Sequence, residues 1–348
     1  MKKLLLPLLA LTLLASSCDP FSVTSSQSYG VVKTSNGGVD WQIGGRFAGE
    51  NGANFNLSIS QIKFGPNSKI FASSYDGGLY KSEDAGETWQ EVLGNISLYD
   101  FVIDPNNDQV IYASGYLEKR GRIFKTLDGG KSWQDIFVDA GDGDPVRTLV
   151  LDPFDSLTIA AGLGKGGVVV SRDGGQSWSL VKNLNDRINQ MVWNDSGLYV
   201  LAKTQGLYRS TQIDGEFEQI TKNLKSSVGR LGVSIFGSNV SDYRRMVIGI
   251  NTQEIMVTTN NGLYRSFDSG NNWNYVSMPY RQSDAAPYAL AVPAGQNSPI
   301  YVSSGSVIFK STDDGQAWSI SETGTTGLVT SILPDQNLST LIFAGVSK

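Results

Sequence analysis

Short apolar segments, separated by turns rich in Gly, Asp and Asn, recur along the chain. Residues 99–103 and 109–113 are two such segments on either side of the turn 104–107. In this turn Pro105 fixes φ, and Asp or Asn side chains can hydrogen-bond the neighbouring backbone. The next apolar segment, residues 123–125, leads directly into a second turn. This succession of short strands and turns predicts an all-β fold made of repeated hairpins.

The second turn carries a motif, Ser/Thr-x-Asp-x-Gly-x-x-Trp, that recurs along the chain. Apolar segments flank each copy, so we expect it to connect two strands of a hairpin. The near-complete copies contain Asp84 and Trp89, Asp128 and Trp133, Asp173 and Trp178, Asp268 and Trp273, and Asp313 and Trp318. An earlier copy has Asn36 in the Asp position and ends at Trp41. A degraded copy over residues 210–217 ends at Phe217.

Each residue type in the motif has a physical role in a turn. The Asp carboxylate accepts hydrogen bonds from turn N–H groups, and the Ser or Thr hydroxyl does so more weakly. Gly permits a positive φ, and Trp supplies a large apolar plate that covers the turn and the neighbouring sheet. Because the same chemistry recurs in every repeat, we interpret these Asp residues as structural rather than catalytic.

The motif resembles the Asp-box, or BNR repeat, found in sialidases, xyloglucanases, sortilin-type receptors and photosystem II assembly factors. The aromatic ends of the boxes follow one another at intervals of about 40 to 56 residues, which is typical of one four-stranded propeller blade. Seven boxes therefore predict a seven-bladed β-propeller of four-stranded antiparallel blades.

The two ends of the chain each contain half a blade. Residues 30–33 and 41–43 read as a third and a fourth strand, whereas residues 328–333 and 341–345 read as a first and a second strand. Pairing the N-terminal strands with the C-terminal strands would complete one blade and remove two exposed strand edges. We therefore expect the ring to be closed in this way.

Composition excludes several classes of function. The 348 residues include 28 Lys and Arg, 33 Asp and Glu and no histidine, with a formal net charge of −5. The acidic balance argues against a nucleic-acid partner, because such proteins usually carry a basic stripe. Without histidine, the chain cannot form a Ser-His-Asp triad or a His-ligated zinc site. The sequence predicts no cofactor.

The N-terminal residues have the pattern of an export signal. Lys2 and Lys3 precede a mostly apolar run over residues 4–15, which is too short to span a bilayer. Residues 15–18 resemble a bacterial lipobox, which implies lipid attachment at Cys18, the single cysteine; signal cleavage that leaves a free thiol is the alternative. Asp19 resembles the signal that retains some Gram-negative lipoproteins in the inner membrane.

These features divide the chain into three parts. We expect a signal peptide at residues 1–17, a lipid-anchored tether at 18–28 and the propeller at 29–348. The mature protein would be exported and anchored to the bacterial cell membrane, facing the periplasm or the exterior.

Loops that precede the first strands ring the mouth of a propeller channel. Arg187 and Arg230 lie just before predicted first strands, and Arg147 is close to the same register. Together they would form a cationic patch suited to a carboxylate or an acidic peptide; three separately solvated arginines are the alternative.

Two further groups of loop residues are candidates for binding. Asp139, Asp142 and Asp144 offer oxygen ligands for calcium, although the loop lacks the full EF-hand pattern and a solvated polar loop is the alternative. Tyr116, Tyr280 and Tyr288 could stack on a sugar or on a partner chain, and ordinary exposed tyrosines are the alternative.

Two classes of function stay open on this evidence. A lipoprotein signal followed by one seven-bladed Asp-box ring resembles the photosystem II assembly and stability factor family. That resemblance implies a non-catalytic platform that recognises a membrane or envelope protein, or a glycan, through loops on one face. The alternative is a sialidase-like or xyloglucanase-like glycoside hydrolase, although sialidases have six blades and xyloglucanases pair two propellers. Sortilin-type capture of a peptide in the channel is a third candidate.

Overall fold

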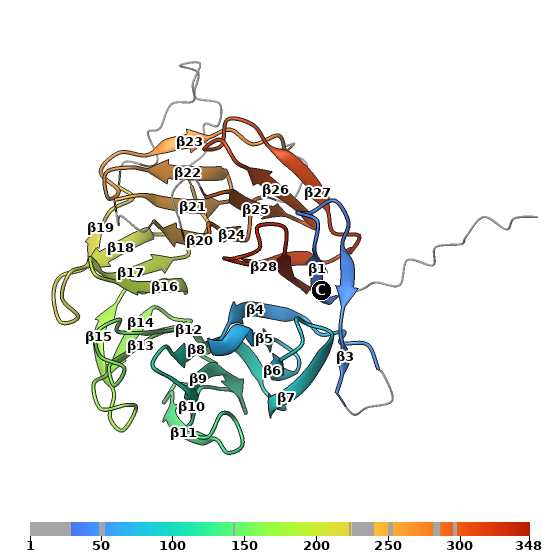
Figure 1. Ribbon diagram of the computed structural model, residues 1–348. Helices are drawn as coiled ribbons and strands as arrows, with labels where there is room; N and C mark the ends of the chain where they lie inside the picture. The colour runs from blue at the N-terminus through green and yellow to red at the C-terminus, as the bar shows by residue number, and fades with distance from the viewer. Residues whose placement is uncertain are drawn as a thin grey trace, which may run out of the picture.

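The computed structural model describes residues 29–48, 53–141, 143–222, 224, 240–249, 253–280, 286–294 and 298–348. Its strands form seven sheets arranged radially in a ring (Figure 1). Six sheets contain four strands each and the remaining sheet contains five. The predicted seven-bladed all-β propeller is therefore confirmed. The expected signal peptide, Cys18 and the tether lie outside the described residues, within which no helix is long and apolar enough to cross a membrane.

The first two strands of each blade make up the inner half of the ring. The innermost strands are β4 (Ile59–Phe64), β8 (Ser97–Asp104), β12 (Val146–Leu151), β16 (Ile188–Asn194), β20 (Tyr243–Ile248), β24 (Leu290–Ala291) and β28 (Leu328–Pro334). The second strands are β5 (Ile70–Ser74), β9 (Asn107–Leu117), β13 (Ile159–Leu163), β17 (Gly197–Ala202), β21 (Ile255–Thr259), β25 (Ile300–Ser304) and β29 (Ile342–Ser347).

The third and fourth strands lie outside them, with an Asp-box between each pair. The third strands are β6 (Gly78–Ser82), β10 (Arg120–Thr126), β14 (Gly167–Ser171), β18 (Gly206–Ser210), β22 (Gly262–Ser266), β26 (Val307–Ser311) and β1 (Gly30–Thr34). The fourth strands are β7 (Thr88–Gly94), β11 (Gln134–Val138), β15 (Ser179–Asn183), β19 (Glu218–Gln219), β23 (Asn274–Val276), β27 (Ser319–Glu322) and β2 (Gln42–Gly44).

The ring closes through one blade that contains both ends of the described chain. Its strand order is β2-β1-β29-β28, and β1 pairs antiparallel with β29 from Gly30 opposite Val346 to Thr34 opposite Ile342. Val32 and Ala344 face each other in this pairing and are fully buried. The predicted closure between N-terminal and C-terminal strands is confirmed.

The Asp-boxes are held by hydrogen bonds within each turn, as the motif predicted. In the third box, Asp128 Oδ1 accepts from the Thr126 hydroxyl at 2.7 Å and from the Ser132 N–H at 2.9 Å. The Ser132 hydroxyl donates to Asp128 Oδ2 at 2.6 Å. Gly130, at φ 96°, donates its N–H to Thr126 Oγ1 at 3.0 Å. Both carboxylate oxygens are thus used inside the turn.

Asn36 shows how the first box keeps this network without a carboxylate. Its Oδ1 accepts from the Thr34 hydroxyl at 2.8 Å and from the Asp40 N–H at 3.0 Å. Its Nδ2 donates to Asp40 Oδ2 at 3.0 Å. Asp40 occupies the position of Ser132 in the third box. There Ser132 donates to the Asp side chain, whereas here the Asn36 side chain donates to Asp40.

The box tryptophans connect neighbouring blades. The indole N–H of Trp133 donates to the Val92 carbonyl at 2.8 Å, and that of Trp178 donates to the Ile136 carbonyl at 3.0 Å. Trp273 and Trp318 make equivalent bonds to carbonyls of their preceding blades. Each Trp therefore attaches its own blade to the outer strand of the blade before it.

Trp89 is the exception, because a short strand absent from our sequence prediction covers it. β3 (Arg46–Phe47) pairs in parallel with β7, and Phe55 then stacks on the Trp89 indole at 4.7 Å between ring centroids. Trp89 is 0% exposed, and its Nε1 has no hydrogen-bond partner among the described residues. Aromatic packing thus replaces the indole hydrogen bond at this junction.

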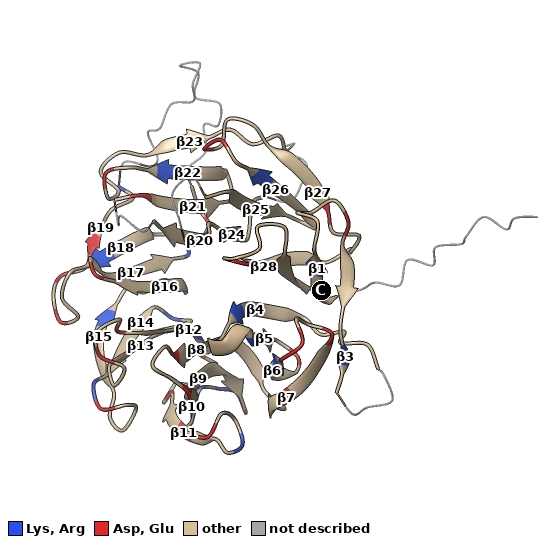
Figure 2. Cartoon of the chain, in the orientation of Figure 1, with Lys and Arg blue, Asp and Glu red and all other residues tan. Residues whose placement is uncertain are grey.

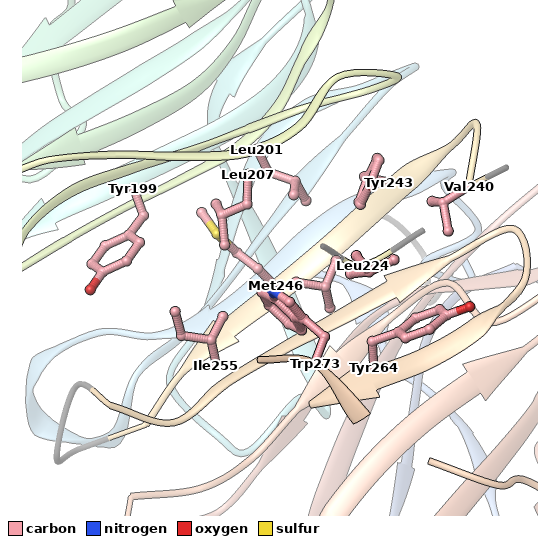
Figure 3. Packing of buried hydrophobic residues seen from close by; sticks show 11 residues of the cluster. Tyr199, Leu201, Leu207, Leu224, Val240, Tyr243, Met246, Ile255, Tyr264 and Trp273 are labelled. Carbon is pink, nitrogen blue, oxygen red and sulfur yellow. The ribbon is translucent and has the colours of Figure 1, made fainter. Parts of the chain in front are cut away.

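The cores lie between adjacent blades. Figure 3 shows one of them, in which Tyr199 and Leu201 of one blade pack with Met246, Ile255 and Trp273 of the next. The sequence left the strands of residues 226–254 unassigned. The structure places the first strand of that blade, β20, at Tyr243–Ile248, whereas residues 225–239 lie outside the described part.

The box carboxylates predict an acid-dependent loss of stability. Hydrogen bonds, from the Ser132 side chain foremost, hold the pKa of Asp128 well below its usual range, and those from Ser177 do the same for Asp173. Because the folded pKa lies below the unfolded value of about 3.9, this stabilisation is present above that pH and is lost as pH falls through the folded value.

We therefore expect the free energy of unfolding to fall steeply with acid only below about pH 4. Urea titrations of the wild type and of an Asp128→Asn/Asp173→Asn variant over a pH series would measure this. The variant should show a shallower acid slope, since Asn cannot titrate. Equal slopes for the two proteins would contradict this account of the boxes.

Candidate functional site

A β-bulge recurs near the start of the innermost strands. In β8, β12, β16 and β20 the register with the second strand shifts across Tyr99, Arg147, Asn189 and Arg244, respectively. A bulge leaves one residue unpaired in the ladder and re-aims its side chain. These four side chains line a pocket at one end of the channel, which we call the channel mouth.

The channel mouth brings together three of the residues that the sequence singled out. Arg147, Arg187 and Tyr288 all line it. The other lining residues are Gln61, Tyr75, Tyr99, Asn189, Asp242, Arg244 and Arg245. The predicted cationic patch thus includes arginines that the sequence did not identify.

Tyrosine rings hold two of these guanidinium groups in place. The Arg147 guanidinium lies 4.8 Å from the centroid of Tyr99, and Tyr75 packs edge-on against Tyr99 at 5.3 Å. On the opposite wall, the Arg245 guanidinium lies 5.0 Å from the Tyr288 ring. Such cation–π contacts orient a guanidinium without occupying all of its N–H donors.

The arginines differ in how far their donors are already occupied. Arg244 is engaged, since it pairs with Asp242 at 3.0 Å and donates to the Ala286 carbonyl at 2.8 Å. Among the described residues, Arg187 donates only its Nε, to Asn189 Oδ1 at 3.0 Å. The buried Nε of Arg147 has no hydrogen-bond partner among the described residues. The terminal guanidinium nitrogens of Arg147 and Arg187 form no hydrogen bond with the described residues, so these donors stay available to a ligand.

The electrostatics of the mouth favour an anion. Burial lowers the pKa of Arg147, and the positive charge of Arg187 lowers it further. Four arginines and one aspartate line the pocket, so its local charge is positive in a chain of net charge −5. Figure 2 shows acidic and basic residues spread around the ring, so the mouth is distinguished by its local cluster. A bound carboxylate would offset the repulsion between the arginines.

The size of the pocket restricts what it can hold. Its volume is about 50 Å³, which is room for a few water molecules or one carboxylate group. Pockets that enclose whole small molecules usually exceed about 300 Å³. The mouth therefore fits an acidic side chain or a chain end better than a sugar ring.

The channel behind the mouth is a larger space of about 330 Å³. Inside it, Asp100 accepts from the Lys63 ammonium at 2.6 Å and from the Leu149 N–H at 3.0 Å. Asp100 is only 6% exposed. Its carboxylate thus links three neighbouring innermost strands, which is a structural role.

The remaining predicted site residues lie elsewhere. Arg230 lies outside the described residues. In the described part of that blade the first strand is β20, which begins at Tyr243, and Arg244 and Arg245 lie at its start. Tyr116 is in β9, paired with Ser97. Tyr280 packs against a core cluster, and burial raises its pKa.

The predicted calcium ligands Asp139, Asp142 and Asp144 lie only partly within the described residues. Asp142 lies outside the described residues. Asp144 is 4% exposed, and burial and then the charge of Asp139 raise its pKa. Within the described part of the chain no group of three or more His, Cys, Asp or Glu side chains is placed to hold a metal ion.

Comparison with known proteins agrees with the propeller fold. No family model matches the chain. Among solved structures, "YCF48 bound to D1 peptide" superposes with a TM-score of 0.62 and 15% identity over 84% of this chain and 94% of that one. The GH74 enzyme of Niastella koreensis superposes with a TM-score of 0.65 and 16% identity over 92% of this chain and 53% of that one.

This chain is a seven-bladed propeller that resembles GH74 xyloglucanases, YCF48 and Vps10. The oligoxyloglucan-reducing end-specific xyloglucanase of Emericella nidulans is 23% identical over 63% of the chain, which corresponds to 27% of that enzyme. The vacuolar protein sorting/targeting protein 10 of Paracoccidioides brasiliensis (strain Pb03) is 33% identical over 24% of the chain and 5% of its own length. The chain thus spans about a quarter or less of these two curated relatives.

Proposed function

We propose that this propeller is a non-catalytic binding platform whose channel mouth captures a carboxylate-bearing segment of a protein partner. The observation that carries the proposal is the pair Arg147 and Arg187. They line one pocket, and their terminal guanidinium nitrogens form no hydrogen bond with the described residues. Arginine guanidinium groups match carboxylates in a paired geometry. The size of the pocket favours an acidic side chain or chain end over a sugar.

One superposing structure is of a propeller of similar size bound to a peptide. At 15% identity that likeness shows the fold alone, so the peptide is a property of that protein. For this chain the partner class rests on the chemistry of the mouth.

We also propose that the platform is exported and attached to a bacterial membrane through a lipid on Cys18. The basic start, the apolar run over residues 4–15 and the lipobox-like residues 15–18 support this. A membrane anchor would confine the mouth to partners in or near the envelope, which raises their effective concentration.

Crosslinking in intact cells tests the partner, followed by detergent extraction, purification through a C-terminal tag and mass spectrometry. We expect the wild type to capture one envelope protein reproducibly, and an Arg147→Ala/Arg187→Ala variant to lose it. The matched control is Arg120→Ala/Arg172→Ala, which removes the same charge from exposed positions outside the mouth. Equal recovery by the mouth variant and the control would contradict the proposal.

Lipid attachment is read out in the same cells by metabolic labelling with an alkyne-bearing fatty acid. The label should enter the wild type and not a Cys18→Ser variant. An unlabelled wild type would contradict the proposed lipid anchor but not the proposed carboxylate site at the channel mouth.

The glycoside hydrolase stays a second candidate because curated relatives are xyloglucanases. Release of reducing sugar from xyloglucan by the purified protein would favour it over the platform. Release of sialic acid from a dye-linked substrate would identify a sialidase instead.

A further inference from the structure

One groove of the ring, which we call the seam groove, lies between the blade of β24 to β27 and the closing blade, β2-β1-β29-β28. It has a volume of about 730 Å³, within the usual range for small-molecule sites. Its walls come from the first and last Asp-boxes and from β27, and they include Trp41 and Trp318. These elements lie on the outer part of the blades, away from the channel mouth.

One residue beside the groove departs from the repeat. At four other junctions the box glycine lies against a branched side chain of the preceding blade: Gly130 against Val92, Gly175 against Ile136, Gly270 against Ile220 and Gly315 against Val276. At the seam, Gly38 lies against Ser321 instead. Serine is smaller than valine or isoleucine, so less of the groove wall at this position is covered by a side chain.

A second departure leaves a carboxylate oxygen available in the same groove. In other boxes a side chain donates to the second oxygen of the Asp, as Ser132 does to Asp128 Oδ2 at 2.6 Å. The last box has Ala317 at that position. Asp313 Oδ1 accepts three hydrogen bonds from its own box, whereas Oδ2 accepts none from the described residues. Both Asp313 and Ala317 line the groove.

The aromatic walls are held in place before any ligand arrives. The Trp41 indole N–H donates to Ser321 Oγ at 2.6 Å, and that of Trp318 donates to the Ser277 carbonyl at 2.8 Å. The polar edges of both rings are thus occupied, which leaves their apolar faces for contact. Exposed Val39 and Ile320 extend this apolar surface.

Lys310 adds a cation to the groove. Its ammonium lies 5.6 Å from the Tyr301 ring and forms no ion pair with the described residues. The groove therefore combines aromatic plates with one ammonium donor and one carboxylate acceptor.

We propose that the seam groove binds a saccharide. A sugar ring has a C–H face that packs on an aromatic plate, and hydroxyl edges that both donate and accept hydrogen bonds. Asp313 Oδ2 would accept from one hydroxyl, and Lys310 would donate to another. A purely apolar ligand would leave the desolvated carboxylate unpaired, which is costly. This site is separate from the channel mouth, so either proposal can fail alone.

Two substitutions that restore the pattern of the other boxes test the proposal without removing a core residue. Ser321→Val adds to the groove wall the branched side chain that Val92 and Val276 provide at their junctions, and it removes the Oγ that accepts the Trp41 indole N–H. Ala317→Ser supplies a hydroxyl that satisfies Asp313 Oδ2 internally, as Ser132 does for Asp128. Both should fold, which circular dichroism melting would check. Arg147→Ala at the channel mouth is the control that should not affect saccharide binding.

The probes are cellotetraose, xyloglucan heptasaccharide, chitotetraose and maltotetraose. Their binding is measured by saturation-transfer NMR and calorimetry. We expect at least one to bind the wild type, and Ser321→Val to weaken it by about tenfold or more. Ala317→Ser should weaken it less, because one polar contact is lost instead of the space. The Arg147→Ala control should bind as the wild type does.

Absence of binding by every probe would overturn the proposal, as would binding that Ser321→Val leaves unchanged. A displayed peptide library tests the alternative that the groove binds a peptide. If the library yields peptides that bind the wild type but not Ser321→Val, and no saccharide binds, the groove would be assigned to a protein partner. That result would also overturn the saccharide proposal.

Discussion

Replacement of Phe55 by alanine should lower the free energy of unfolding by about 3–5 kcal/mol, the usual cost of removing a buried phenyl ring. Phe55 is 1% exposed and stacks on Trp89 with ring centroids 4.7 Å apart. It also meets Tyr80 edge-on at 5.0 Å and Phe47 at 5.3 Å. Aromatic pairs add roughly 0.5–1.5 kcal/mol each beyond the area that they bury.

The effect should be large because Trp89 depends on this ring. The other near-complete boxes attach their tryptophan to the preceding blade by an indole hydrogen bond, and Trp89 has no such bond. Without Phe55, the face of a fully buried tryptophan would lie against a cavity next to the closing blade. The segment that carries Phe55 would also lose its main contact with β7.

Urea unfolding followed by tryptophan fluorescence measures the difference. Phe154→Ala is the matched control: this phenyl ring is 78% exposed, so its loss should change stability by no more than about 0.5 kcal/mol. If Phe55→Ala and Phe154→Ala had equal effects, the cover over Trp89 would carry no stabilising role.

The fold was predictable because most of the information in each box is local. Thr126, Asp128, Gly130 and Ser132 bond within one turn, so their spacing in the sequence is enough to identify it. The position of Trp133 was also predictable, but its hydrogen-bond partner was not. That partner, Val92, belongs to the preceding blade, and no local pattern records it.

The strand β3 could not be predicted for a related reason. Arg46 and Phe47 lie outside any box, and they pair with β7 in parallel, which no hairpin connects. Their strand lies beside the strand of Trp89, and the segment after it places Phe55 over the indole, which needs this packing in place of a hydrogen bond. Such a need becomes visible only when the ring is assembled.

The channel mouth was predicted in part. Arg147 and Arg187 were predicted from their places before first strands, and Tyr288 was predicted as a loop tyrosine. The structure places all three in one pocket. Arg244 and Arg245 were missed because the strands of residues 226–254 had two possible divisions. Tyr75 was missed because it follows a second strand, outside the loops that the sequence singled out. The bulges that aim Tyr99 and Arg147 leave no pattern in the sequence.

The largest functional effect is expected at Arg147 and Arg187. Hydrogen bonds to charged groups contribute roughly 1.5–3 kcal/mol each, and about 1.4 kcal/mol changes an affinity tenfold. An Arg147→Ala/Arg187→Ala variant should therefore lose about 100-fold or more in affinity for a ligand whose carboxylate both arginines bind. Salt should weaken the wild-type interaction as well, because the pocket is only partly buried.

The most direct measurement is calorimetric titration of an acetylated tetraglutamate amide, with the tetraglutamine amide as the uncharged match. The account predicts that the wild type binds the glutamate peptide in clear preference to the glutamine peptide. It also predicts that Arg147→Ala/Arg187→Ala abolishes this preference and that Arg120→Ala/Arg172→Ala retains it. Equal binding of both peptides by the wild type, or a preference that survives in the mouth variant, would contradict the assignment of the channel mouth as a carboxylate site.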